Sequence, residues 1–272
     1  MLNDCANMVQ IQGNTFIVSG GASGLGKGVV EVFIGKGAKV TILDVNEIEG
    51  YKLQDRFPGQ VLFPGKVDIT DPAAVEKALN QVSENPEFSR FSGAVLCAGI
   101  MSVGLIAALR EHSAPYGVQD MDAFKRMLEV NVLGSFNVAQ KVSERMILQD
   151  SDPTNEGERG VIVLTSSYTS TDGQRGSIGY STTKGALSSM VLPMARDLAP
   201  YGIRVNAVAP GVFLTPINDS FVNERSKCGE FPQRPGRPEE FGAFVEHIFL
   251  NEMINGAVLR QDAALRGAIS IE

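Results

Sequence analysis

Short apolar runs alternate with stretches of helical periodicity through most of this 272-residue chain. The runs have the length of strands and little internal polarity, which is typical of strands buried on both faces of a sheet. They lie at 15–19, 39–43, 61–63, 93–96, 161–165, 203–208 and 257–259. This order predicts an α/β fold, in which a mostly parallel, doubly wound sheet of seven strands carries helices on both faces. We expect the whole chain, 1–272, to form one such domain.

The predicted helices between these strands have recognisable starts. Asn46 is positioned to cap one helix, and Asp71 followed by Pro72 gives another helix a cap and a favourable first residue. The longest helical patterns span 121–146, 180–198 and 239–250. Ligands of such sheets bind beyond the carboxyl ends of the strands. The site is therefore expected in the segments after Ser19, Leu43, Leu96, Thr165 and Val208.

Glycines are concentrated after the first predicted strand. Seven of the 29 glycines fall within 20–37, and the turn at 19–26 joins a buried strand to a helix start. Glycine there allows a tight turn and lets a pyrophosphate approach the backbone at the helix N-terminus. This context predicts a Rossmann-type dinucleotide site. The alternative is a glycine-rich turn without a ligand.

Asp44 ends the second predicted strand, 18 positions beyond Gly26. A carboxylate there accepts hydrogen bonds from the adenosine ribose and repels the 2′-phosphate of NADP. No arginine follows it closely, and Ser23 in the turn is neutral, so the sequence favours NAD(H). The alternative for Asp44 is a helix cap. Asp68 is a candidate partner of the adenine amino group, or a loop cap.

Tyr180 and Lys184 stand four residues apart, which places them on one face of a helix. A phenol has a pKa of about 10. A nearby ammonium, together with the positive nicotinamide of NAD⁺, favours the phenolate and lowers that pKa. Tyr180 would then act as a general base toward an alcohol, or as a general acid toward a ketone. By itself the spacing is common and mostly marks a surface pair.

Two more polar residues lie where this chemistry needs them. Ser167 follows the fifth predicted strand at the expected ligand edge, where its hydroxyl could hold a substrate oxygen near Tyr180. Asn131 lies inside the long helix at 121–146, where asparagine is a poor helix former. Its placement hints at a purpose, although a solvent-facing or backbone-bonded side chain is an equal alternative.

These motifs together resemble the short-chain dehydrogenase/reductase family over nearly the whole chain. The family's T-G-x-x-x-G-x-G turn appears at 19–26, and its catalytic Asn, Ser, Tyr and Lys match Asn131, Ser167, Tyr180 and Lys184. The resemblance implies that the lysine also binds the nicotinamide ribose, that the asparagine holds a water in a proton relay, and that Val212 and Thr215 hold the carboxamide. The implied cofactor-binding residues are Gly20, Ser23, Gly24, Leu25, Gly26, Asp44, Asp68, Ile69, Cys97, Ala98, Gly99, Tyr180, Lys184, Pro210, Gly211, Val212 and Thr215.

Two segments depart from the family's pattern. The family's N-N-A-G after the fourth strand is Leu96-Cys97-Ala98-Gly99 here, which removes both asparagines and their polar bonds. At the last strand the chain has Arg260-Gln261-Asp262-Ala263-Ala264, where many relatives have Asp-Gly-Gly.

The stretches 192–205 and 255–260 are similar to the NAD-dependent short-chain 3-hydroxyacyl-CoA dehydrogenases, which also oxidise hydroxysteroids. The resemblance implies oxidation of a secondary alcohol, with a pocket formed by 101–119, 168–179 and 214–235. The last of these is long and without clear period, as a substrate lid would be, or a surface loop. Arg110, Arg175 and Lys227 are candidates for a CoA phosphate, or solvated surface charges. Relatives are homotetramers or homodimers, and the resemblance implies the same for this chain.

Composition excludes several other classes. A net charge of −7 disfavours nucleic-acid binding. The chain has no run of about 18 apolar residues, so no membrane helix is predicted. Three dispersed cysteines, two histidines and no apparent targeting signal favour a cytoplasmic protein without a metal site. Two alternative functions stay open: an NADPH-dependent 3-oxoacyl reductase, which Asp44 disfavours, and a catalytically inactive NAD-binding regulator.

Overall fold

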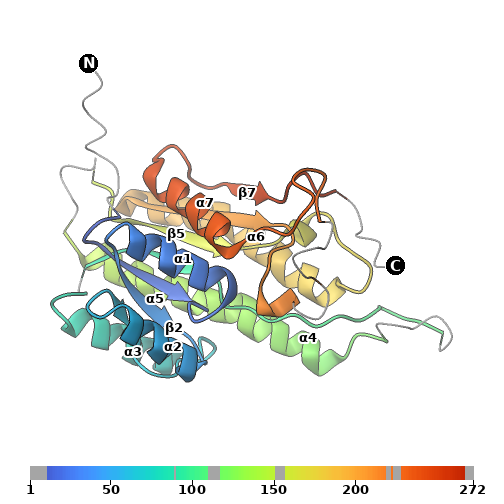
Figure 1. The fold of residues 1–272 in the computed structure, drawn as a ribbon, viewed down its shortest axis with the longest axis horizontal. Coiled ribbons are helices and arrows are strands. Elements are labelled where there is room, and N and C mark those ends of the chain that lie inside the picture. Colours follow the sequence, from blue (N-terminus) through green and yellow to red (C-terminus); the bar gives the residue numbers. More distant parts are fainter. Residues whose placement is uncertain are drawn as a thin grey trace, which may run out of the picture.

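Seven strands form one parallel sheet in the computed structural model (Figure 1). The structure describes residues 11–88, 90–109, 117–150, 157–218, 222 and 228–266. The strands are β1 (Thr15–Ser19), β2 (Lys39–Leu43), β3 (Val61–Leu62), β4 (Phe91–Leu96), β5 (Gly160–Thr165), β6 (Ile203–Pro210) and β7 (Val258–Gln261). Their spatial order is β3-β2-β1-β4-β5-β6-β7, and every pairing between named strands is parallel. The predicted α/β, doubly wound Rossmann-type fold is confirmed.

Helices cover both faces of the sheet because both faces of each central strand are apolar. On one face α1 (Gly24–Gly35) and α7 (Pro238–Leu250) pack together over β1 and β4. Three phenylalanines, Phe16, Phe33 and Phe249, meet edge to face there, with ring centroids 4.8–5.3 Å apart. The other face carries α3 (Pro72–Glu84), α5 (Ser135–Leu148) and α6 (Ile178–Leu198). A further helix, α2 (Glu47–Arg56), follows β2.

The predicted helix starts are confirmed at the level of single hydrogen bonds. The Asn46 side chain accepts a bond from the Glu49 amide at 3.2 Å, which caps α2. The Asp71 side chain accepts from the Ala73 amide at 2.8 Å, and Pro72 is the first residue of α3. These bonds satisfy amides that a helix N-terminus otherwise leaves unpaired.

The long helix predicted at 121–146 differs from a regular α-helix. The chain forms α4 (Met121–Met127), then a π-helical segment, η2 (Leu128–Gly134), and then α5 without a break. A π segment has i→i+5 hydrogen bonds, so it rotates the side chains that follow relative to a regular α-helix. The predicted long helix at 121–146 is confirmed in its extent, its middle is π-helical, and Asn131 lies within the π segment.

Candidate active site

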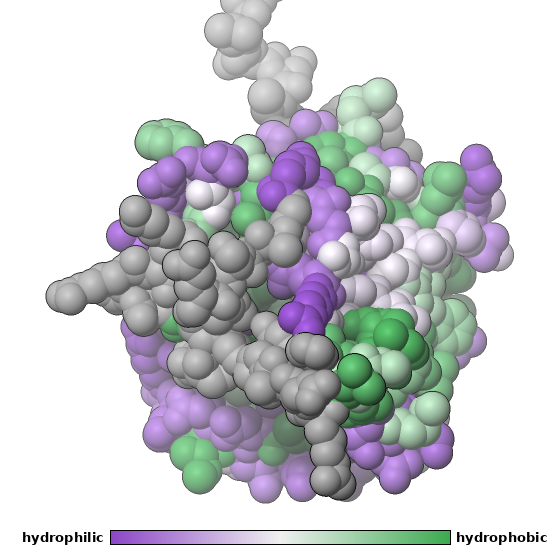
Figure 2. Space-filling view, turned by 90° about the vertical axis from the view of Figure 1, so that its right-hand side faces the viewer, coloured by the Kyte–Doolittle hydropathy of each residue, from purple (hydrophilic) through white to green (hydrophobic). Residues whose placement is uncertain are grey.

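A large cleft opens at the carboxyl ends of the strands, where the sheet order reverses between β1 and β4. Its volume is about 1,060 Å³, and residues following β1, β2, β4, β5 and β6 line it. Figure 2 shows this end of the molecule, where hydrophobic and hydrophilic residues lie beside each other on the surface. All five segments expected to form the site therefore meet in one cavity.

The glycine-rich turn forms one wall of this cleft and leaves no room for side chains. Gly20 has a φ of +67°, and a Cβ on it would lie 2.7 Å from the backbone of Ala98. A Cβ on Gly26 would lie 2.2 Å from the Gly20 carbonyl oxygen. The turn is thus packed at backbone level, with Ser23, Gly24 and Leu25 lining the cleft. This cradle, at the N-terminus of α1, suits the pyrophosphate of a dinucleotide.

Asp44 lies at the end of β2, beside the turn. One carboxylate oxygen accepts the Ala22 amide at 3.0 Å, and the other accepts the Asn46 amide at 2.9 Å. The carboxylate therefore braces the turn against β2, and it does not itself cap α2. Each oxygen retains a lone pair for a ribose hydroxyl.

Asp68 faces the same cleft beside Ile69. Its carboxylate accepts from the amide and hydroxyl of Thr70 and pairs with Arg126 at 3.3 Å. Arg126 also lines the cleft and was not predicted from the sequence, because it lies within a helical pattern 58 residues away.

Ser167 and Tyr180 lie next to each other. Ser167 begins the short 3-10 helix η3 (Tyr168–Ser170), and its Oγ accepts from the amide and hydroxyl of Thr169 at 3.2 and 2.9 Å. Burial and Tyr168 raise the pKa of Tyr180 above its ordinary value, and a hydrogen bond with Ser167 lowers it only in part. Tyr180 is therefore a neutral phenol in this structure.

Lys184 is buried on the same helix as Tyr180. Its Nζ donates to the Thr165 carbonyl at 2.7 Å and lies 5.5 Å from the centroid of the Tyr180 ring. Burial lowers the pKa of Lys184 to about 8, which Cys97 opposes only weakly. The predicted pairing of phenol and amine is thus present as a geometry, with the Lys184 amine directed at the backbone of β5.

Cys97 takes the place of an asparagine that the family resemblance leads one to expect. The Thr165 hydroxyl donates to its Sγ at 3.3 Å, and its amide donates to the Ser19 carbonyl at 3.0 Å. The Ser19 hydroxyl also accepts from the Ala98 amide at 3.4 Å. Backbone groups and two hydroxyls therefore supply polar contacts in this segment. Burial raises the pKa of Cys97 to about 11, so it remains a neutral thiol.

Asn131 is fully buried and holds together two segments of the site. Its side chain accepts from the Ile100 amide at 2.8 Å and donates to the Ile100 carbonyl at 2.9 Å and to Thr183 Oγ1 at 3.0 Å. A Cβ on Gly99 would lie 3.2 Å from the Asn131 side-chain oxygen. Of the two alternatives considered for Asn131, the structure shows the backbone-bonded one.

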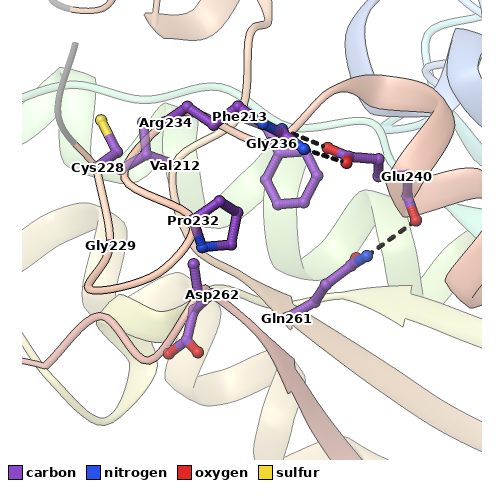
Figure 3. Close-up of a pocket in the computed structure, with 11 residues that line it drawn as sticks. Val212, Phe213, Cys228, Gly229, Pro232, Arg234, Gly236, Glu240, Gln261 and Asp262 are labelled. Atoms are coloured by element: carbon purple, nitrogen blue, oxygen red, sulfur yellow. Dashed lines mark hydrogen bonds and ion pairs between the residues drawn. The ribbon is translucent and has the colours of Figure 1, made fainter.

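The segment after β6 closes the cleft opposite the glycine turn. Pro210, Gly211, Val212 and Thr215 all line it, and a Cβ on Gly24 would lie 3.4 Å from Thr215. Behind this segment lies a smaller hollow of about 180 Å³ (Figure 3), where Arg234 forms two bonds to Glu240. Arg234 holds the pKa of Glu240 near about 2, so the pair is ionised at neutral pH.

All three predicted substrate segments contribute described residues to the cleft. Met101, Val103, Tyr168 and Arg175 line the cleft, as do Ile217 and Cys228 from the predicted lid at 214–235. Tyr168 was not singled out in the sequence, although it directly follows Ser167. Arg110 and Lys227 lie outside the described residues.

The described residues contain no group of three or more metal-ligating side chains, and none of their helices is long and apolar enough to cross a membrane.

Comparison with known proteins places this site in context. The short chain dehydrogenase family matches residues 14–226. The 3-hydroxyacyl-CoA dehydrogenase type-2 of Rattus norvegicus is 36% identical over 260 residues, covering 94% of this chain and 96% of the relative. Ipsdienol dehydrogenase of Ips pini is 30% identical, covering 95% and 99%. The crystal structure of 3-hydroxyacyl-CoA dehydrogenase type-2 from Mycobacterium avium superposes with a TM-score of 0.85 at 31% identity, covering 96% and 99%.

Proposed function

The chain belongs to the short-chain dehydrogenase family, and on this premise we propose that it transfers a hydride between NAD(H) and a secondary alcohol or ketone. The observation that carries the proposal is the convergence of Ser167, Tyr180 and Lys184 in one cleft with the glycine turn. The proposed substrate is a 3-hydroxyacyl-CoA, which the names of the similar proteins support, or a hydroxysteroid, which rests on the family resemblance of the sequence. The unit is one domain, with a substrate lid near 214–235.

Each catalytic residue has a role that its surroundings support. Ser167 Oγ holds the substrate oxygen, and Tyr180 takes the hydroxyl proton in oxidation or returns it in reduction. Because burial raises the pKa of Tyr180, its deprotonation depends on nearby positive charge. Lys184, which lies beside the phenol, supplies part of that charge and would also bind the nicotinamide ribose. When bound, NAD⁺ would supply the hydride acceptor.

Asn131 would contribute to the proton relay by holding the π segment in place, and not by binding the water with its own side-chain amide. Since its side-chain amide is already bonded to Ile100 and Thr183, any water that it helps to hold would bind another atom of the π segment.

The cofactor is proposed to be NAD(H) because Asp44 lines the cleft beside the glycine turn, where its charge would repel the 2′-phosphate of NADP. The predicted binding residues on the glycine turn, at 68–69, 97–99 and 210–215 line the same cleft. An NADPH-dependent 3-oxoacyl reductase, the activity named for a 29% identical relative from Thermotoga maritima, is the alternative that Asp44 disfavours.

Assembly and location are proposed as well. We expect a homotetramer or homodimer in the cytoplasm, because apolar side chains such as Leu133 and Phe136 are exposed on the helices and the cysteines are few.

The experiment that tests the reaction is NADH formation with 3-hydroxyacyl-CoAs, hydroxysteroids and simple secondary alcohols. Tyr180→Phe is expected to abolish turnover and leave NADH affinity within about threefold, because the ring remains and only the proton carrier is lost. Tyr201→Phe, an exposed tyrosine beyond α6, is the matched control and is expected to retain full activity. Undiminished oxidation by Tyr180→Phe would refute the mechanism.

The cofactor assignment has its own test. Asp44→Ala is expected to narrow the preference for NAD over NADP by roughly tenfold or more, because it removes both the ribose acceptor and the repulsive charge. A wild-type preference for NADP would refute the assignment.

A further inference from the structure

Arg260 joins three segments at one guanidinium group. It lies on β7, with its side chain three-quarters buried. It donates to Asp172 at 2.6 Å, to Thr171 Oγ1 at 3.0 Å and to the Leu265 carbonyl at 3.0 Å. It also contacts Asp262 through two nitrogens. Four acceptors around one planar cation define its orientation much more strictly than a single exposed ion pair would.

The Asp172 side of this cluster is continuous with the turn that carries Ser167. The Asp172 amide donates to the Tyr168 carbonyl at 2.9 Å, and the Thr171 hydroxyl donates to the same oxygen at 3.3 Å. At the start of this turn, Thr169 donates to Ser167 Oγ. Arg260 therefore holds one end of a short, internally bonded turn whose other end is the Ser167 hydroxyl.

The Asp262 side of the cluster lies against the segment after β6. A Cβ on Gly211 would come 2.8 Å from Asp262 Cα, and the Gly211 amide donates to the Gln261 carbonyl at 2.9 Å. The Asp262 side chain is only 7% exposed, so its charge depends on its arginine partners. Arg260 thus connects the turn that carries Ser167 to the backbone at Pro210 and Gly211.

The Arg260–Asp172 ion pair is formed at neutral pH. Arg260 holds the pKa of the Asp172 carboxyl below its ordinary value, and the hydrogen bonds to Asp172 and Asp262 raise the pKa of Arg260. Arg260 therefore joins the two walls of the cleft through charge-assisted hydrogen bonds at neutral pH.

We propose that Arg260 is a positioning residue, which fixes the Ser167 turn relative to the Pro210–Gly211 backbone and so sets the distance between the bound alcohol and the nicotinamide. The proposal rests on the dehydrogenase function proposed above. Arg260 itself touches neither substrate nor cofactor in this role. Its effect falls on the rate of hydride transfer, which is sensitive to displacements of about 1 Å.

The test compares Arg260→Gln with Arg266→Gln. Arg266 also binds Asp262, at 2.8 Å, but within the described part of the chain it makes no hydrogen bond to the Ser167 turn and acts on Asp172 through its charge alone, so it is a matched control for the hydrogen bonds of Arg260. Arg260→Gln is expected to lower kcat by roughly 10- to 100-fold and to leave the NADH dissociation constant within about threefold. Arg260→Lys is expected to recover part of the loss, because an ammonium pairs with one carboxylate but lacks the fork.

A second readout separates positioning from loss of folded protein. With a substrate deuterated at the carbinol carbon, Arg260→Gln is expected to show a larger isotope effect on kcat than the wild type, since hydride transfer becomes slower. A merely structural role would lower the active fraction and leave the isotope effect unchanged. That result, or an equal fall of kcat in the Arg266→Gln control, would overturn the proposal.

A wild-type protein inactive on every substrate would refute the proposed function instead. The positioning role is then decided by hydrogen exchange at the Thr169 and Asp172 amides. Arg260→Gln is expected to speed hydrogen exchange at these two amides, and Arg266→Gln is not. Equal protection of the amides in both variants would overturn the positioning role.

Discussion

Lys184 is 3% exposed, and among the described residues the acceptor of its amine is the Thr165 carbonyl. Loss of hydration lowers its pKa from 10.5 to about 8. Between these two values the unfolded chain binds more protons at this site than the folded chain does. The free energy of unfolding therefore rises with pH through this window, and the buried charge is a cost at neutral pH.

We predict that the free energy of unfolding of Lys184→Met, relative to the wild type, is highest at pH 7 and falls by up to about 3 kcal/mol by pH 10.5. The reason is that the wild type loses its buried charge as the pH rises, whereas the variant has no charge to lose. Urea unfolding at the two pH values without NAD(H) measures it. Lys125→Met, on an exposed side chain, is the control and should show no such trend. A Lys184→Met difference that is independent of pH would contradict the prediction.

Two alanines adopt a left-handed backbone after β7. Ala263 and Ala264 have φ values of 52° and 59°, where a Cβ costs roughly 1–2 kcal/mol. These are the positions at which many family members carry glycine. We predict that Ala264→Gly raises the free energy of unfolding by about 0.5–1 kcal/mol after the entropy of glycine is deducted. Ala243→Gly, exposed within α7, is expected to lower it by about 1 kcal/mol. Thermal unfolding of both variants measures these changes. Changes in the free energy of unfolding that have the same sign in both variants would contradict the prediction.

Site residues were predictable where they follow a predicted strand or belong to a sequence motif. Ser167, Tyr180 and Lys184 meet in the cleft because strand order and helix spacing alone bring them there. Arg260 lies in two of the segments compared with the family, but no role was predicted for it, since its partner Asp172 lies 88 residues away and neither residue has a local signal. Tertiary ion pairs of this kind cannot be inferred from a single sequence.

At the scale of elements, η2 shows how a tertiary contact overrides local preference. Its residues, LEVNVLG, include the poor helix former Asn131, but nothing in the pattern distinguished a π-helix from an α-helix. The segment is stabilised from outside, by the bonds of Asn131 to Ile100 after β4 and to Thr183 in α6. Strands and caps were predictable because their signals are local, whereas this irregularity is not.

We predict that Asn131→Leu lowers the free energy of unfolding by about 2–4 kcal/mol, because it removes the side-chain partner of the part-buried Ile100 amide and carbonyl and of the buried Thr183 hydroxyl. Chemical denaturation measures the change. As a control, Asn85→Leu, at an exposed helix end, is expected to change stability by less than about 1 kcal/mol. A neutral Asn131→Leu would show that η2 does not depend on these bonds.

At the scale of the whole molecule, the long helices expose several large apolar side chains. Leu133 and Phe136, three residues apart on one helical face, are 60% and 45% exposed, and Leu192 on α6 is 46% exposed. Exposed apolar side chains that cluster mark contact surfaces. In a closed homo-oligomer the same surface would meet its own copy, so each of these side chains would be buried in both subunits of a contact.

We predict that Phe136→Asp converts the proposed homotetramer or homodimer to a smaller species, because each symmetric contact would then bury a charge without a partner. A loss of about 3 kcal/mol per contact weakens association by roughly 150-fold. Light scattering during size-exclusion chromatography, at one fixed protein concentration, measures the mass. Met253→Asp, on a side chain that is 92% exposed beyond α7, is the control and should leave the mass unchanged. A monomeric wild type, or equal masses for wild type and Phe136→Asp, would show that this surface is not the contact.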